Sequence, residues 1–236
     1  MKDQQQEKIF TKDFINVSLT QLLVFVVFYA LLTTLPIYIT VYLGESQANA
    51  GLAVTFMLVS AVIIRPFSGK ILDLFGKKNT LVTSVLLYTI STFFYIWFND
   101  LLPLLALRFF HGLSFGILTT ATGAIVANIV PESRKGAGMG YFALASNIAM
   151  VLGPFIGLTI IQFMSFKLMF IILNVFMVIG LICSIAVKVK EDHVPAKLNI
   201  ESIKMTWNDF IEVSTIPIGF FSALVGFGYA SILSFV

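Results

Sequence analysis

Residues 65–78 read RPFSGKILDLFGKK, and this stretch does most to decide the fold. It opens with an arginine inside an apolar run and ends in a tight basic turn with two glycines and one acid. Membrane topology alone needs only the basic residues, whereas Gly69 and Gly76 suit close helix approach and a sharp reversal. Asp73 is expected to pair with a lysine or to face a helix amino terminus. The segment therefore predicts a structured connection between two membrane helices.

The composition around this stretch is that of a membrane protein. Of the 236 residues, 58% are hydrophobic and 11% are charged, and the mean hydropathy is +0.96. These values lie far outside the range of soluble domains and exclude a soluble enzyme. The single cysteine, Cys183, excludes an intramolecular disulfide.

Long apolar runs, each close to or above the roughly 20 residues that cross a bilayer, alternate with short polar breaks. All should be helices, because a lone strand would leave its backbone groups unpaired in hydrocarbon. The predicted membrane helices are 17–42, 50–72, 80–98, 101–130, 136–164, 168–187 and 215–236. The first is too long for a signal peptide.

The basic residues predict the orientation of these helices. The side that includes the amino terminus receives twelve of the 15 Lys and Arg residues, the other side receives only Lys167, and Arg65 and Arg108 lie within predicted helices. The amino terminus of a multi-pass plasma-membrane protein is therefore expected in the cytoplasm. The twelve are Lys2, Lys8, Lys12, Lys70, Lys77, Lys78, Arg134, Lys135, Lys188, Lys190, Lys197 and Lys204.

The lengths of the breaks predict three parts. Residues 1–187 form a six-helix bundle, in which the tiny breaks 99–100 and 165–167 force consecutive helices to be antiparallel neighbours. Residues 188–214 are a cytoplasmic loop, either with an amphipathic surface helix or as a plain solvated linker. Residues 215–236 are a seventh membrane helix, still apolar where the sequence stops, so the chain looks truncated.

Two further patterns follow in the fourth and fifth predicted helices. Arg108 is followed by Gly112 and Gly116, small residues one and two turns later. In the fifth helix small residues recur with a proline, which removes a backbone donor, while the last glycine leaves room for a neighbouring helix. These residues are Gly140, Ala149, Gly153, Pro154 and Gly157.

Together the three patterns resemble motifs of the major facilitator superfamily, in the expected order along the chain. Segment 65–78 resembles motif A, G-x-L-x-D-x-x-G-[RK]-[RK], with Ile71 at the Leu position. The Arg108 pattern resembles motif B. The fifth helix resembles motif C, the antiporter signature, in which Ala149 and Leu158 replace two glycines. The resemblance covers the whole chain.

The resemblance implies a transporter fold of two six-helix halves, each built from two inverted three-helix repeats, joined by a long loop at 188–214. It implies small-molecule efflux in exchange for protons, with Asp73 as a conformational latch where the halves meet. A solvated counter-ion of Lys77 and Lys78 is an equally good interpretation of Asp73. A missing carboxy-terminal half would then be the partner of this chain in the bilayer.

Arg108 is the most informative single residue. A guanidinium inside a bilayer costs roughly 2.5 kcal/mol or more and persists only with partners or water. It is therefore expected to face the bundle interior. On a helix it shares one face with His111, so the two are expected to share one polar cavity. The resemblance implies that Arg108 lies on the proton or substrate route. The alternatives are an arginine that ties helices together through carbonyls and a histidine held by hydrogen bonds. No Asp or Glu occurs inside the first six predicted helices.

Weaker candidates for the pathway are Arg65, which could also snorkel toward the cytoplasmic face, and Asn147. In a lone bundle the face with Arg108 and His111 is expected to be exposed to lipid. The alternative functions are a sugar or organic-ion permease of the same fold and a non-transporting membrane fragment. No nucleotide-binding loop, metal-ligand cluster or nucleophile–base arrangement occurs, so no enzyme, cofactor, metal or nucleic-acid partner is predicted.

Overall fold

The computed structural model describes residues 8–189, 219–221 and 224. The chain divides into two compact units, Met1–Ala196 and Lys197–Val236. In the second unit the described residues are helical. Most of the predicted loop 188–214 and of the predicted seventh helix 215–236 lies outside the described residues.

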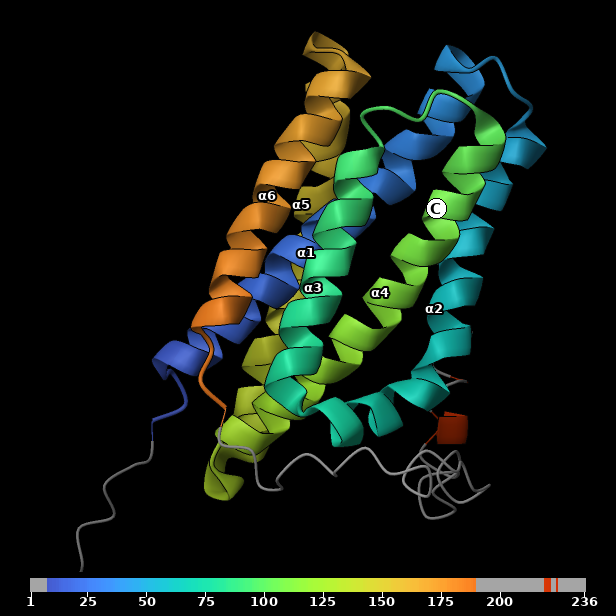
Figure 1. Cartoon of the computed structure of the whole chain (residues 1–236). Coiled ribbons are helices and arrows are strands. Elements are labelled where there is room, and N and C mark those ends of the chain that lie inside the picture. Colours follow the sequence, from blue (N-terminus) through green and yellow to red (C-terminus); the bar gives the residue numbers. More distant parts are fainter. Residues whose placement is uncertain (1–7, 190–218, 222–223, 225–236) are drawn as a thin grey trace, which may run out of the picture. The chain divides into compact units, whose positions relative to one another are not determined.

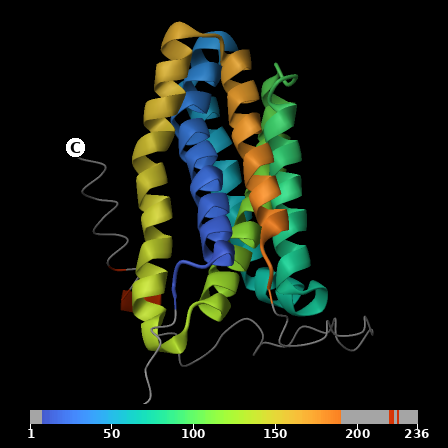
Figure 2. The same ribbon diagram turned by 90° about the vertical axis from the view of Figure 1, so that its left-hand side faces the viewer.

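Six long helices, joined by short turns, make up the first unit (Figure 1). A π-helical turn, η1 (Tyr38–Tyr42), follows the first helix, and a short 3-10 turn, η2 (Glu132–Arg134), precedes the fifth. The six are α1 (Lys12–Ile37), α2 (Gln47–Phe75), α3 (Lys77–Phe94), α4 (Leu101–Ile129), α5 (Lys135–Phe163) and α6 (Phe166–Ala186). They run alternately up and down the bundle, which confirms the all-helical fold class (Figures 1 and 2).

We call the end of the bundle where α1 begins the amino-terminal end, at the bottom of Figure 1, and the other the opposite end. Hydroxyl side chains start three helices by accepting a backbone N–H of the first turn: Thr11, Ser46 and Ser165. Gly76 ends α2 and begins α3 with a φ of 80°, a conformation that favours glycine. The sharp reversal expected at Gly76 is therefore present.

The length and apolarity of the helices suit a bilayer. Five described segments are long and apolar enough to cross one: Lys12–Tyr42, Gln47–Phe75, Leu101–Ile129, Glu132–Phe163 and Phe166–Ala186. The remaining helix, α3, is shorter than these five segments. It begins with two lysines and carries several Ser and Thr residues. It ends at Phe94, four residues before the predicted end, because the chain turns at 95–97.

The helices pair in a pattern that repeats within the unit. Helix α4 packs mainly on α2 and α3, α1 packs mainly on α5 and α6, and α3 packs on α6. Helices α1, α2 and α3 correspond to α4, α5 and α6 in this pattern, because exchanging each helix with its counterpart leaves the pairs unchanged. Corresponding helices run in opposite directions (Figure 1). Two inverted three-helix repeats produce this arrangement, with α1 and α4 the most buried of the five long apolar segments.

Candidate functional site

Arg108 lies inside the bundle, with an exposed fraction of 0%. Its Nε donates to the Ala53 carbonyl at 3.2 Å, and Nη1 donates to the Met57 thioether at 2.9 Å. Both partners belong to α2, so the side chain joins α4 to α2. Nη1 also reaches the Tyr95 hydroxyl at 3.4 Å, whereas Nη2 is buried without a hydrogen-bond partner in the described part of the chain.

His111 lies one turn after Arg108 and is also fully buried. Its Nδ1 is 3.1 Å from the Tyr95 hydroxyl and its Nε2 is 3.4 Å from the Thr92 hydroxyl. The Tyr88 ring covers the imidazole, with 3.9 Å between ring centroids. Arg108 and His111 are therefore connected through one side chain, that of Tyr95, which follows α3 directly. We call Arg108, His111, Tyr95, Thr92 and Tyr88 the buried polar cluster.

The burial of this cluster corrects one expectation. A six-helix bundle alone was expected to expose Arg108 and His111 to lipid, yet α2 and α3 cover both side chains completely. The reason is that the Arg108 face of α4 points toward neighbours of the same bundle, and its two glycines let α2 come close. The Arg108 link to the Ala53 carbonyl is also the tie between helices that was considered as the alternative.

Gly112 and Gly116 form the close contact between α4 and α2. A Cβ at Gly112 would collide with the Ser60 hydroxyl and the Met57 carbonyl, and one at Gly116 would meet the Ala61 carbonyl at 2.7 Å. Glycine is therefore required here by the approach of another backbone. The contact lies directly below the buried polar cluster on the same face of α4.

Gly153 and Gly157 form the corresponding contact between α5 and α1. A Cβ at Gly153 would lie 2.8 Å from the Val26 carbonyl, and one at Gly157 would lie 2.9 Å from Thr34 Cγ2. Ala149, one turn earlier, is fully buried on the same face, and α5 continues through Pro154.

Gly69 does not behave as its pattern suggested, and Gly140 of the motif C pattern has open space around it as well. A Cβ at Gly69 or at Gly140 would meet no heavy atom within 4 Å in the described bundle. The expectation of close helix approach at Gly69 is therefore wrong for this unit, because α2 turns that position to its exposed face.

A neutral polar link between α1, α4 and α5 was not predicted from the sequence. The Gln21 amide donates to the Ser146 hydroxyl at 3.2 Å and accepts from the Thr122 hydroxyl at 2.8 Å. Gln21 and Thr122 are both buried. A glutamine in the predicted helix 17–42 was a visible signal, since an amide in a membrane helix needs polar partners.

Lys78 joins α3 to the end of α6 at the amino-terminal end of the bundle, in addition to adding a positive charge there. Its ammonium donates to the carbonyls of Ser184, Ile185 and Val187 at the end of α6. The Lys188 amide, next along the chain, donates to Asp13 of α1 at 2.7 Å. A cation on the last carbonyls of a helix stabilises that terminus. Lys78 and Asp13 thus bring α1, α3 and α6 together.

The other predicted site residues lie on the surface of the unit. Asp73 is exposed on the last turn of α2, which extends three residues past its predicted end. Arg65 and Asn147 are exposed on α2 and α5, so the structure brings neither to the buried polar cluster.

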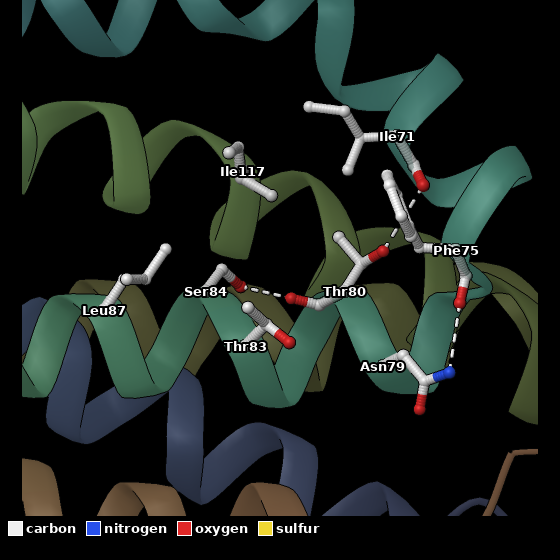
Figure 3. A pocket seen from close by; sticks show the side chains of 8 residues that line it. All are labelled: Ile71, Phe75, Asn79, Thr80, Thr83, Ser84, Leu87 and Ile117. Atoms are coloured by element: carbon white, nitrogen blue, oxygen red, sulfur yellow. Dashed lines mark hydrogen bonds between the residues drawn. The ribbon is translucent and has the colours of Figure 1, made fainter.

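Two cavities open at the ends of the bundle. The one at the amino-terminal end, between α2, α3 and α4, has a volume of about 330 Å³ and is lined by Ile71, Phe75, Asn79, Thr80, Thr83, Ser84, Leu87 and Ile117 (Figure 3). Figure 3 shows the Thr80 and Ser84 hydroxyls turned onto backbone carbonyls, which leaves this cavity largely apolar. The cavity at the opposite end has about 230 Å³ and includes Tyr95 among its walls.

Comparisons with known proteins identify relatives of this fold. The family model described as Major Facilitator Superfamily matches residues 17–236. The quinolone resistance protein NorA of Staphylococcus aureus is 31% identical over 123 residues, which are 52% of this chain and 31% of that protein. The uncharacterized MFS-type transporter MJ1560 of Methanocaldococcus jannaschii is 30% identical over 115 residues, 49% and 30% of the two chains.

Solved transporters share the fold. The peptide transporter POT in complex with sulfate superposes with a TM-score of 0.70 at 19% identity, covering 94% of this chain and 46% of that chain. The human organic anion transporter MFSD10 gives a TM-score of 0.61 at 18% identity, covering 74% and 46%. The chain thus spans less than half of the proteins it matches. Since the family model covers all of the chain from residue 17 onward, the protein belongs to the Major Facilitator Superfamily.

Proposed function

We propose that this chain holds the amino-terminal six-helix half, followed by the seventh helix, of a plasma-membrane transporter that exports small molecules in exchange for protons. The buried polar cluster carries the proposal: a permanent charge and a titratable imidazole meet inside a membrane bundle. Ionisable groups at such depth are expensive and usually mark ion or substrate pathways. In most structural roles an apolar side chain would pack as well at lower cost.

The direction of transport is inferred from similarity. The motif C resemblance is associated with exchange against protons, and its Gly153 and Gly157 form the α1–α5 contact. NorA is named for quinolone resistance. We therefore expect the substrates to include amphipathic aromatic compounds of the quinolone kind.

The proposed orientation places the amino-terminal end of the bundle in the cytoplasm. It is supported by the twelve basic residues predicted on that side against Lys167 on the other. Single cysteines near Lys135 should react only with reagents that reach the cytoplasm, in a background that lacks Cys183, whereas one near Asn99 should react from outside. Labelling of the Lys135 site from outside intact cells would contradict the orientation.

Transport is proposed to need a second six-helix bundle, because alternating access rocks two bundles about a site between them. The test uses membrane vesicles from cells that express this chain together with the carboxy-terminal half of NorA. An imposed pH gradient should drive accumulation of a fluorescent quinolone, and a protonophore should abolish it. Vesicles with either half alone serve as controls. Accumulation that ignores the gradient would contradict proton exchange, and gradient-driven accumulation by this chain alone would contradict the need for a second bundle.

A further inference from the structure

The cavity at the opposite end of the bundle is polar as well as roomy. Its volume of about 230 Å³ far exceeds the roughly 15 Å³ that one buried water needs. Its walls include Tyr38 and Asn99, and the Tyr38 hydroxyl donates to the Asn99 side chain at 3.1 Å. The lining residues come from both ends of η1, the turn that follows α3 and the start of α6: Tyr38, Tyr42, Tyr95, Ile96, Asn99, Ser165, Phe166, Lys167 and Phe170.

Tyr95 belongs both to this cavity and to the buried polar cluster. It lines the cavity, and its ring stacks on Phe170 at 5.6 Å between centroids. Its hydroxyl contacts Arg108 and His111, and only 1% of the residue is exposed. Tyr95 is therefore the member of the cluster that joins the cavity to Arg108 and His111.

The hydrogen bonds around His111 have one consistent direction. The Thr92 hydroxyl has one proton and lies nearer to the Tyr88 carbonyl, at 2.9 Å, than to His111 Nε2, at 3.4 Å. We therefore assign that proton to the carbonyl, which makes the hydroxyl an acceptor toward Nε2. The Tyr95 oxygen accepts from Arg108 Nη1, so its own proton is left for His111 Nδ1. His111 is then a neutral imidazole with its proton on Nε2, facing Arg108, Tyr88 and Tyr95.

We propose that the cavity is a water-filled vestibule and that the Tyr95 hydroxyl relays protons between it and His111. In one step Tyr95 gives its hydroxyl proton to Nδ1 and takes one from a hydronium ion in the vestibule, which becomes water. The tyrosine is unchanged and the imidazole gains one proton. The unpartnered Nη2 of Arg108 is a further buried donor that water would satisfy. This inference rests on the proposed proton exchange and places the proton entry within this single bundle.

The first test is the tautomer of His111, measured by nitrogen-15 NMR on the full chain in liposomes. Only two histidines occur in the sequence, so His193→Gln leaves one signal. The protein should show the Nε2-protonated form. Tyr95→Phe keeps the ring and removes the donor to Nδ1, so the tautomer ratio should change by roughly fivefold, the effect of one hydrogen bond.

Tyr88→Phe is the matched control, because its hydroxyl donates to the Val24 carbonyl and not to the imidazole. It should leave the His111 signal in place. An Nδ1-protonated imidazole in the unsubstituted protein, or equal spectra for Tyr95→Phe and Tyr88→Phe, would overturn the relay. These spectra do not depend on transport, so failure of the proposed function and failure of the relay are distinguishable.

The second test asks whether the vestibule holds water. A cysteine at Ile96, in a Cys183→Ser background, should react with a small water-soluble thiol reagent. A cysteine at Val27, which is fully buried, should react at least roughly tenfold more slowly. Equal, slow reaction at both positions would show that the cavity is dry and would overturn the proposal.

Discussion

The α2–α4 contact and the α1–α5 contact are built in the same way, yet of the two only the α2–α4 contact has a buried charged side chain beside it. In each, two glycines four residues apart on one helix receive the backbone of the other. Arg108 lies beside Gly112 and Gly116, and its guanidinium donates to the Ala53 carbonyl and the Met57 thioether of α2. The α1–α5 contact instead has the neutral Gln21 beside it, which bonds to Ser146 of α5 and also to Thr122 of α4.

This difference separates two features of the bundle: the close packing of small residues, which both contacts share, and the buried charge, which one contact has. Small residues recur in both halves of the bundle because close packing is what holds helices together where lipid is as apolar as the side chains. The charge occurs once, so it is not required by the packing. The repeated contacts therefore suffice for the packing of the fold, and the proposed role of Arg108 goes beyond the tie that it makes between α4 and α2.

The largest effect on stability is expected for Gly112→Ala. The new methyl would collide with the backbone carbonyl of Met57, which cannot move aside as a side chain can. We expect a loss of about 2 kcal/mol, seen as a lower midpoint of thermal helix loss in detergent by circular dichroism. Gly123→Ala on the same helix is the control, because a Cβ there meets nothing within 4 Å. Equal midpoints for the two variants would contradict the close α2–α4 contact.

A smaller loss, about 1 kcal/mol, is expected for Gly153→Ala. The added Cβ would meet Tyr29 Cβ at 2.6 Å and the Val26 carbonyl at 2.8 Å, so the α1 backbone must move, but by less than the α2 backbone at Gly112, where the Met57 carbonyl lies closer to the added Cβ. Gly140→Ala, with open space around it, should leave the melting midpoint unchanged or slightly raised. If Gly153→Ala proved more damaging than Gly112→Ala, the ranking of the two contacts would be reversed.

The smallest expected change concerns the neutral link. Thr122→Val removes the hydroxyl that donates to Gln21 and should cost about 0.6 kcal/mol, the average for polar links between membrane helices. Thr120→Val is its control, because among the described residues the Thr120 hydroxyl bonds within its own helix, to the Gly116 carbonyl. A double-mutant cycle with Gln21→Leu measures the coupling free energy between Thr122 and Gln21. A coupling of zero would show that this hydrogen bond does not contribute to stability.

The fold was predictable because its signals are local: apolar runs, caps such as Thr11, and the glycine reversal at Gly76. Arg108 was predictable as well, since a charge in an apolar helix is visible without a structure. Its partners were not, because Tyr95 and Met57 look like two more apolar residues among many. Their role depends on which helices become neighbours.

Two assignments failed for the same reason. The Arg108 face was expected to meet lipid and Gly69 was expected to meet a helix, and the structure reverses both. Spacing along a helix shows which residues share a face but not which neighbour that face meets. Lys78 illustrates the same limit, because its α6 carbonyl partners are more than 100 residues away in sequence.

The most direct test of the account is to measure stability and transport together for Arg108→Met. Methionine fills a similar space without a charge, and replacing a buried ion by a packed apolar side chain is often neutral or stabilising. The Tyr95 hydroxyl keeps its contact with His111. We predict an unchanged or higher melting midpoint, and loss of gradient-driven quinolone accumulation in vesicles that contain both halves. A much lower midpoint, or transport at the unsubstituted rate, would contradict the claim that Arg108 serves function and not folding.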